Sequence, residues 1–345
     1  MLKKKIPWMI LFVVIAAFSI WTVTMQSKNF SWEELKNVLQ NINVPWITLA
    51  IISMTGFIFF EGFALNCLTS GLAGKKSLGS ATIYGAADVY FSAITPSASG
   101  GQPASAFFMI LDKIPAAITT VILLVNLIMY TFALLFCAVI VVIFNGSLFT
   151  LFNLPGKILI LVGVVVLFIL ATVFWMLLKK EEIIKRIALF LIGVGAKAHI
   201  LRRPTKKRAK LDQIMLQYEE CSDAINGKRS MLFKAFVFNL LQRISLSFVT
   251  VFSYLAIGGD INNFFRVWSI QIFTTLGSNS VPIPGAMGVH DYLLLQGLGT
   301  LSDVTNAANL ELISRGLSFY VCVIISALII ICGYLYRKIK NSKEV

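Results

Sequence analysis

The sequence predicts an all-α protein that crosses a membrane several times, on the basis of composition, apolar run length and two interrupted apolar segments. Of its 345 residues, 57% are hydrophobic and 13% are charged, whereas soluble domains carry about a quarter of charged residues. The mean hydropathy is +0.82. Several runs reach the roughly 20 residues that a helix needs to cross about 30 Å of hydrocarbon. We expect about six full spans, at 6–25, 45–67, 116–144, 157–178, 230–257 and 312–336.

The first membrane half is expected to cover residues 1–178. Its run 6–25 is longer than the apolar core of a usual secretory signal, and no Ala-x-Ala-like cleavage site follows. We therefore expect a retained first helix that leads out of the cytoplasm. The stretch from Trp32 to Asn41 is amphipathic and is expected to lie at the external interface, before the run 45–67 returns.

The segment 80–112 holds two apolar pieces that are each too short to span, separated by TPSASGGQP at 95–103. Basic side chains favour the cytoplasmic side of a membrane, and they flank both ends of this segment as Lys75, Lys76 and Lys113. We therefore expect a re-entrant hairpin that enters from the cytoplasm and turns at TPSASGGQP.

The segment 179–229 is expected to be a basic cytoplasmic linker with amphipathic helices. With both chain termini in the cytoplasm, the positive-inside rule accounts for the net charge of +14. The basic stretch 179–230 is expected to contact anionic lipid, and no nucleic-acid role is expected. This placement leaves six of the 30 lysines and arginines on the external side or within the membrane. They are Lys28, Lys36, Lys157, Arg243, Arg266 and Arg315.

The second membrane half, 230–345, repeats this scheme. Its segment 262–299 is interrupted at SVPIPGAMG, and we expect a polar loop at 300–310. Because the run 230–257 ends outside, the second re-entrant hairpin must enter from the external face. One hairpin from each side indicates an inverted repeat, in which paired Gly/Pro interruptions mark a binding site near the membrane midplane.

Irregular chain at membrane depth persists only where it is buried in protein or lines a wet cavity, because unpaired backbone groups cost several kcal/mol in hydrocarbon. In the first break, Gly100 and Gly101 permit a sharp turn, and the following half-helix presents free N–H groups and a positive dipole end. This end can bind a lipid phosphate. In the second break, Asp291 is expected to cap its own helix or to attract a cationic head group. The alternative is that both breaks only pack helices together.

Five charged side chains lie inside the expected spans, where each is costly and should face a partner, water or the protein interior. They are Glu61, Asp88, Arg243, Asp291 and Arg315. Two have simpler structural accounts, since Arg315 can pair with Glu311 one turn earlier and Glu61 can join a salt bridge. The predicted head-group site comprises Ser97, Ser99, Gly100, Gly101, Gln102, Pro284, Gly285, Gly288, Asp291, Asp88, Arg243 and Arg315, with Glu61 and His290 as secondary members.

No catalytic residues, cofactor or metal site are expected. The five cysteines contain no CxxC pair, which indicates neither a disulfide framework nor a zinc site. The sequence contains no GxSxG or HExxH motif, so an intramembrane hydrolase is not predicted.

The two interrupted motifs, taken together, give the chain a family resemblance. Thr95–Pro103, the stretch PIPGAMGVHD at 282–291, and Arg315 followed by Phe319–Tyr320 occur in order along essentially the whole chain. In these features the sequence resembles the membrane domain of lysylphosphatidylglycerol synthase and flippase proteins. It departs from the commoner pattern with Asp291 in place of a glutamate and Ala286 in place of a second glycine.

The resemblance implies a multi-pass protein of the bacterial cell membrane that moves a lipid between leaflets, with both termini cytoplasmic. The lipid would be an anionic or aminoacylated phospholipid or a polyprenyl-linked sugar lipid, and a homodimer is one arrangement it allows. In bifunctional relatives a separate cytosolic domain transfers lysine from aminoacyl-tRNA to phosphatidylglycerol. We expect no such domain in the 345 residues given, and hence no catalysis. The alternatives are a membrane component of lysylphosphatidylglycerol synthesis and a non-transporting scaffold for a lipid-modifying enzyme.

Overall fold

The structure is a computed structural model. It describes residues 32–343 except 96–97, 180–181, 184, 187–188, 190–214, 216–218, 220–222, 224, 226, 280, 282, 284–285, 287 and 302–303. The predicted first helix, most of the basic linker, and the site residues Ser97, Pro284 and Gly285 therefore lie outside the described residues.

The described chain is helical and contains no strand. The short helix α2, Trp32–Gln40, coincides with the predicted amphipathic stretch. Long helices follow at α3 (Val44–Leu72), α6 (Ala116–Asn145), α7 (Leu154–Lys179), α10 (Arg229–Ala256) and α14 (Cys322–Lys343). Shorter helices are α4 (Leu78–Ile94), α5 (Gly101–Leu111), α11 (Phe264–Ser278), α12 (Val289–Leu298) and α13 (Val304–Arg315).

Within the described residues, five helical stretches are long and apolar enough to cross a membrane. They confirm a multi-pass all-α fold and agree with five of the predicted spans. These stretches are Val44–Leu72, Ala116–Leu151, Leu154–Leu178, Arg229–Ala256 and Ala307–Gly333.

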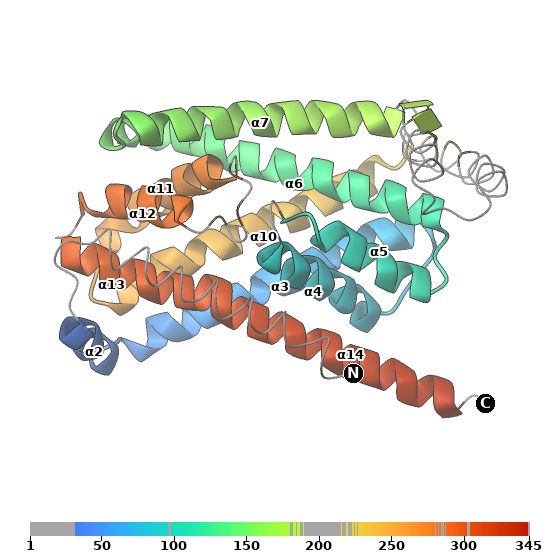
Figure 1. Ribbon diagram of the computed structural model, residues 1–345, viewed down its shortest axis with the longest axis horizontal. Helices are drawn as coiled ribbons and strands as arrows, with labels where there is room; N and C mark the ends of the chain where they lie inside the picture. Colours follow the sequence, from blue (N-terminus) through green and yellow to red (C-terminus); the bar gives the residue numbers. More distant parts are fainter. Residues whose placement is uncertain are drawn as a thin grey trace, which may run out of the picture.

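The long helices run roughly along the long axis of the molecule (Figure 1). The pair α4 and α5 lies toward one end of this axis, and the pair α11 and α12 lies toward the other. The most extensive contact between two elements joins α3 to α10, and α4 also packs on α3 and on α14. The two short-helix pairs thus lie toward opposite ends of the molecule, and the inverted repeat itself stays a prediction.

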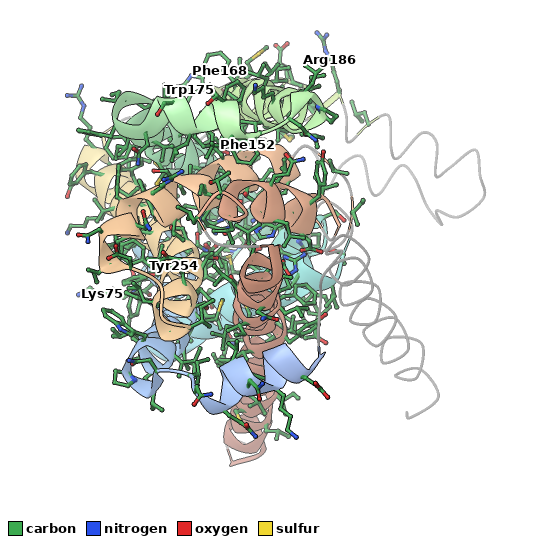
Figure 2. The ribbon with its side chains drawn as sticks, turned by 90° about the vertical axis from the view of Figure 1, so that its left-hand side faces the viewer. Lys75, Phe152, Phe168, Trp175, Arg186 and Tyr254 are labelled. Atoms are coloured by element: carbon green, nitrogen blue, oxygen red, sulfur yellow. The ribbon has the colours of Figure 1, made fainter. Side chains whose placement is uncertain are left out.

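The outer face of α7 carries large apolar side chains that no part of the described protein covers. Phe168 is 67% exposed, whereas its neighbour Leu167 is 4% exposed and packs inward. Figure 2 shows Phe168 and Trp175 on the outer side of this helix. Such a face is costly in water and is normal in contact with lipid tails.

The predicted polar loop at 300–310 is wrong, because α13 begins at Val304 within that range. Ala307, Ala308 and Leu310 are buried in the bundle. Asn309 of the same segment is also buried, as is Glu311 directly after it. Part of the segment that we predicted to be a polar loop is therefore packed inside the bundle.

The last helix contains one π-helical stretch, Gly316–Val321, which joins α13 to α14 directly after Arg315. A π-turn holds an extra residue per turn and occurs often at functional sites. In this chain the π-turn follows the charged end of α13.

Candidate functional site

The first short-helix pair is interrupted at the predicted position. Helix α4 ends at Ile94, and α5 begins at Gly101. The intervening turn is held by Thr95, whose hydroxyl accepts the N–H of Gly100 at 2.8 Å and donates to the carbonyl of Phe91 at 2.6 Å. With 17 and 11 residues, these helices measure about 26 Å and 17 Å. Each is shorter than the hydrocarbon core of a membrane.

The carboxylate of Asp88 lies against the start of α5. It accepts hydrogen bonds from the Gln102 amide at 2.8 Å and from the Ser92 hydroxyl at 3.0 Å. A Cβ atom on Gly101 would lie 2.1 Å from Asp88 Oδ1, so the close approach requires a glycine. A negative charge there is stabilised by the positive end of the helix dipole. Asp88 thus lies close to the position where we expected a lipid phosphate.

Glu61 joins three long helices through a buried hydrogen-bond network. Its carboxylate accepts the amide N–H groups of Asn126 on α6 at 2.7 Å and of Gln242 on α10 at 2.6 Å. Asn126 in turn accepts a hydrogen bond from Asn239 at 3.0 Å. All four side chains are at most 3% exposed. The partners of Glu61 in this network are neutral amides. The network therefore does not contain the salt bridge that we considered as a structural role for Glu61.

A close crossing of α3 and α4 brings Glu61 and Asp88 near each other. A Cβ atom on Gly85 would lie 2.5 Å from the Gly62 nitrogen and 2.8 Å from its Cα. The two backbones therefore touch at these glycines, as at many helix contacts in membranes. Glu61 precedes one of these glycines, and Asp88 follows the other by about one turn.

Arg243 supplies the positive charge of this region. Its guanidinium donates to the Tyr130 hydroxyl at 3.2 Å and lies over the rings of Tyr130 and Phe57, at 4.2 and 5.1 Å from their centroids. Its charge interacts electrostatically with both Glu61 and Asp88. We call Glu61, Asp88 and Arg243 the central cluster. All three are nearly buried, with at most 7% of each side chain exposed.

In the second short-helix pair, too, a carboxylate lies at the start of a helix, here that of Asp291 at the start of α12. Gly288 has a φ of +78°, a backbone conformation that favours glycine. Its N–H donates to Asp291 Oδ2 at 2.9 Å, so Asp291 caps its own helix, as the first of our two alternatives stated. Arg315 Nε lies 3.4 Å from the other oxygen of Asp291. The sequence analysis did not predict this partner for Arg315.

A second group of buried charges surrounds this pair, and we call His290, Asp291, Glu311 and Arg315 the second cluster. His290, Asp291 and Glu311 each offer one atom that can bind a metal ion, and these three atoms lie within 4.8 Å of one another. This donor set is able to hold a cation, although the sequence predicted no metal site. Glu311 was considered only as a possible partner of Arg315. Its position inside an apolar run, one turn before a charged residue, was the available signal.

Two cavities in the described part of the chain lie away from both breaks. The first, of about 530 Å³, lies between α3 and α10 and has a mixed lining of apolar residues with Lys234, Asn66 and serines. The second, of about 500 Å³, is almost wholly apolar and lies between α6 and α10. Neither of these cavities is lined by the residues of the two tips. The wet pocket that we expected between the tips is thus not one of these two cavities.

These features define the class of the protein as an all-α, multi-pass membrane protein with two interrupted helix pairs and charged side chains in its interior. The chain belongs to the family described as the lysylphosphatidylglycerol synthase TM region, which matches residues 8–326. This match confirms the resemblance found in the sequence. Searches of curated proteins and of solved structures returned no match.

Proposed function

We propose that this protein is a lipid translocase that moves a charged lipid between the leaflets of the bacterial cell membrane. Membership of the family supports a role with membrane lipids. The observation that carries the proposal is the central cluster, in which three buried charges lie beside a helix pair too short to span. A charged side chain at membrane depth costs about 2.5–3.5 kcal/mol on insertion scales. Keeping three together is therefore consistent with a functional role.

The cavity between α3 and α10 is suited to bind a lipid when it first contacts the protein. Lys234 supplies a positive charge for a phosphate, and Phe63 and Phe238 supply an apolar wall for the upper acyl chains. The Oδ1 atom of Asn66 is buried without a hydrogen-bond partner in the described chain, so it is able to accept a head-group hydroxyl or ammonium. Asn66 lies five residues from Glu61 on α3, about 8 Å along the helix. The cavity and the central cluster thus share helices α3 and α10.

The charges of the central cluster favour a head group that carries both signs. Two carboxylates, Glu61 and Asp88, interact electrostatically with the same guanidinium, that of Arg243. An aminoacylated phospholipid offers the complementary set, because its phosphate can pair with Arg243 and its ammonium groups with the carboxylates. A plain anionic phospholipid or a polyprenyl-linked sugar would leave at least one carboxylate uncompensated. We therefore favour the aminoacylated phospholipid among the lipids considered.

The proposal is tested with purified protein in liposomes that contain a labelled aminoacyl-phospholipid. A translocase changes the fraction of label accessible from outside, a component of lipid synthesis produces a new lipid, and a scaffold does neither. A Gly101→Leu variant should lose lipid movement, because its side chain would displace Asp88 and Ser92 from the start of α5.

The matched control is Gly79→Leu on α4, where an added Cβ meets only the Ser77 hydroxyl at 4.0 Å. This variant should move lipid at the wild-type rate, and tryptophan fluorescence should report native folding for both proteins. Lipid movement that is unchanged in Gly101→Leu would exclude the break at α5 as the transport site.

A further inference from the structure

The second cluster contains more buried negative charge than its positive charge compensates. Asp291 and Glu311 are both 0% exposed, and Arg315 is the cation placed beside them. One carboxylate oxygen of Asp291 and one of Glu311 lie within 4.8 Å of each other. Two ionised carboxylates in contact repel strongly, and an uncompensated buried charge is costly. The cluster therefore needs one more positive charge.

Glu311 is the side chain that lacks a donor. Neither of its carboxylate oxygens accepts a hydrogen bond from any donor in the described chain. Both oxygens are buried, and one of them lies within 4.8 Å of the ligand atoms of His290 and Asp291. A fully buried carboxylate with no donor is expected to carry a proton or to contact a bound cation.

The hydrogen bonds around His290 favour a proton over a metal ion. The Thr250 hydroxyl donates to Gln271 Oε1 at 2.9 Å, which leaves the Gln271 amide nitrogen facing His290 Nε2 at 3.1 Å. Because an amide nitrogen only donates, Nε2 accepts, and the ring proton is then on Nδ1, which lies 3.8 Å from Asp291 Oδ1. No lone pair of His290 then remains for a metal. A metal ion would also lie beside the guanidinium of Arg315.

We propose that Asp291 and Glu311 form a proton-binding site that couples lipid movement to a proton gradient. In the bound state a proton from water forms an O–H bond on Glu311, which donates to Asp291, and the cluster is neutral. Loss of that proton to water leaves two carboxylates that compete for Arg315. The other titratable or charged groups beside Glu311 in the described chain are His290 on α12 and Arg315 on its own helix. This inference rests on the proposed transport function for its coupling, and on geometry alone for the bound proton.

The proton can influence transport through Asp291, because this residue holds the start of α12. Its Oδ2 atom accepts the N–H of Gly288, and its Oδ1 atom faces Arg315. Repulsion from an ionised Glu311 weakens both contacts and displaces the end of the half-helix at the second break. Protonation restores them. The position of α12 thus follows the protonation state of Glu311.

The bound proton is tested on the purified full chain by infrared difference spectroscopy. The wild type should show the carbonyl stretch of a buried protonated carboxylic acid at neutral pH, and Glu311→Gln should lose it. Asp291→Asn should also lose it, because Glu311 then pairs alone with Arg315. The matched control Glu33→Gln, an exposed position on α2, should keep the band. A band that persists in both cluster variants would overturn the site.

The coupling is tested in liposomes at a clamped membrane voltage with labelled aminoacyl-phospholipid. If one proton moves with each lipid, a difference of one pH unit should drive up to about a tenfold lipid excess in one leaflet. In Glu311→Gln the lipid distribution should no longer respond to the pH difference. If the wild type moves lipid but the pH difference does not change the lipid distribution, the coupling to protons is overturned. The proposed function is then not contradicted. An intact infrared signal without any lipid movement would instead contradict the proposed function.

The competing occupant is a metal ion, and elemental analysis of the purified protein decides between them. We expect no stoichiometric metal and no effect of a chelator on the infrared band. One equivalent of metal that is lost in Glu311→Gln and retained in Glu33→Gln would overturn the proton assignment.

Discussion

The contact between Gly62 and Gly85 yields a quantitative prediction for the Gly85→Ala variant. The new Cβ would lie 2.5 Å from the Gly62 nitrogen and 3.1 Å from the Glu61 carbonyl carbon. Since comfortable contacts begin near 3.5 Å, α3 and α4 must separate by roughly 1 Å. Overpacking of this kind costs about 1–3 kcal/mol, and backbone atoms cannot rotate away. Alanine regains up to about 1 kcal/mol of helix propensity, so we expect a net loss of about 1–2 kcal/mol.

The control for this prediction is Gly79→Ala in the same helix. Gly79 is exposed, and its nearest neighbour would lie 4.0 Å from the added Cβ. This change is expected to be neutral or stabilising by up to about 1 kcal/mol. The unfolding free energies, measured by SDS titration of the purified protein with tryptophan fluorescence, should therefore differ by about 2 kcal/mol between the two variants. Equal stabilities would refute the backbone contact at Gly62 and Gly85.

Two further predictions concern the placement of the chain in the membrane, and both use a cysteine-free background. A nitroxide at Phe168 should be quenched strongly by oxygen dissolved in lipid, whereas a nitroxide at Leu167 should be shielded, because these side chains are 67% and 4% exposed. Equal quenching at both positions would contradict the packing of α7. A membrane-impermeant maleimide should label Asn262→Cys in intact cells and label Lys75→Cys only after lysis, since the positive-inside rule places Lys75 in the cytoplasm. The opposite pattern would reverse the predicted orientation.

The positions of the helices were largely predictable, because the membrane sets the length of an apolar run. The run 116–144 became α6, Ala116–Asn145, and the run 230–257 became α10, Arg229–Ala256. The first break was also predictable, since no helix continues comfortably through Pro-Ser-Ala-Ser-Gly-Gly. The start of α13 was not predictable from polarity, because Asn309, a polar residue of this helix, is buried inside the protein.

The charged residues of the site were predictable as a set, and their pairings were not. Charge inside an apolar run singled out Glu61, Asp88, Arg243, Asp291 and Arg315. Glu61 bonds to residues 65 and 181 positions away, and no periodicity in one sequence specifies such contacts. The same limit applies to Arg315, which meets Asp291 on a different helix. Which charges meet depends on how the helices pack, and this information came from the structure.

The π-turn at Gly316–Val321 lies where one helix changes its partners. Before it, α13 packs on α10 and α12, and after it, α14 packs on α4 and α3. The same rod thus belongs to both halves of the molecule. A movement of one half against the other would have to bend this helix between its two sets of contacts, and sharp bends in helices occur at π-turns of this kind. The π-turn is therefore the place where this helix would bend if the proposed transport opens the protein first toward one face of the membrane and then toward the other.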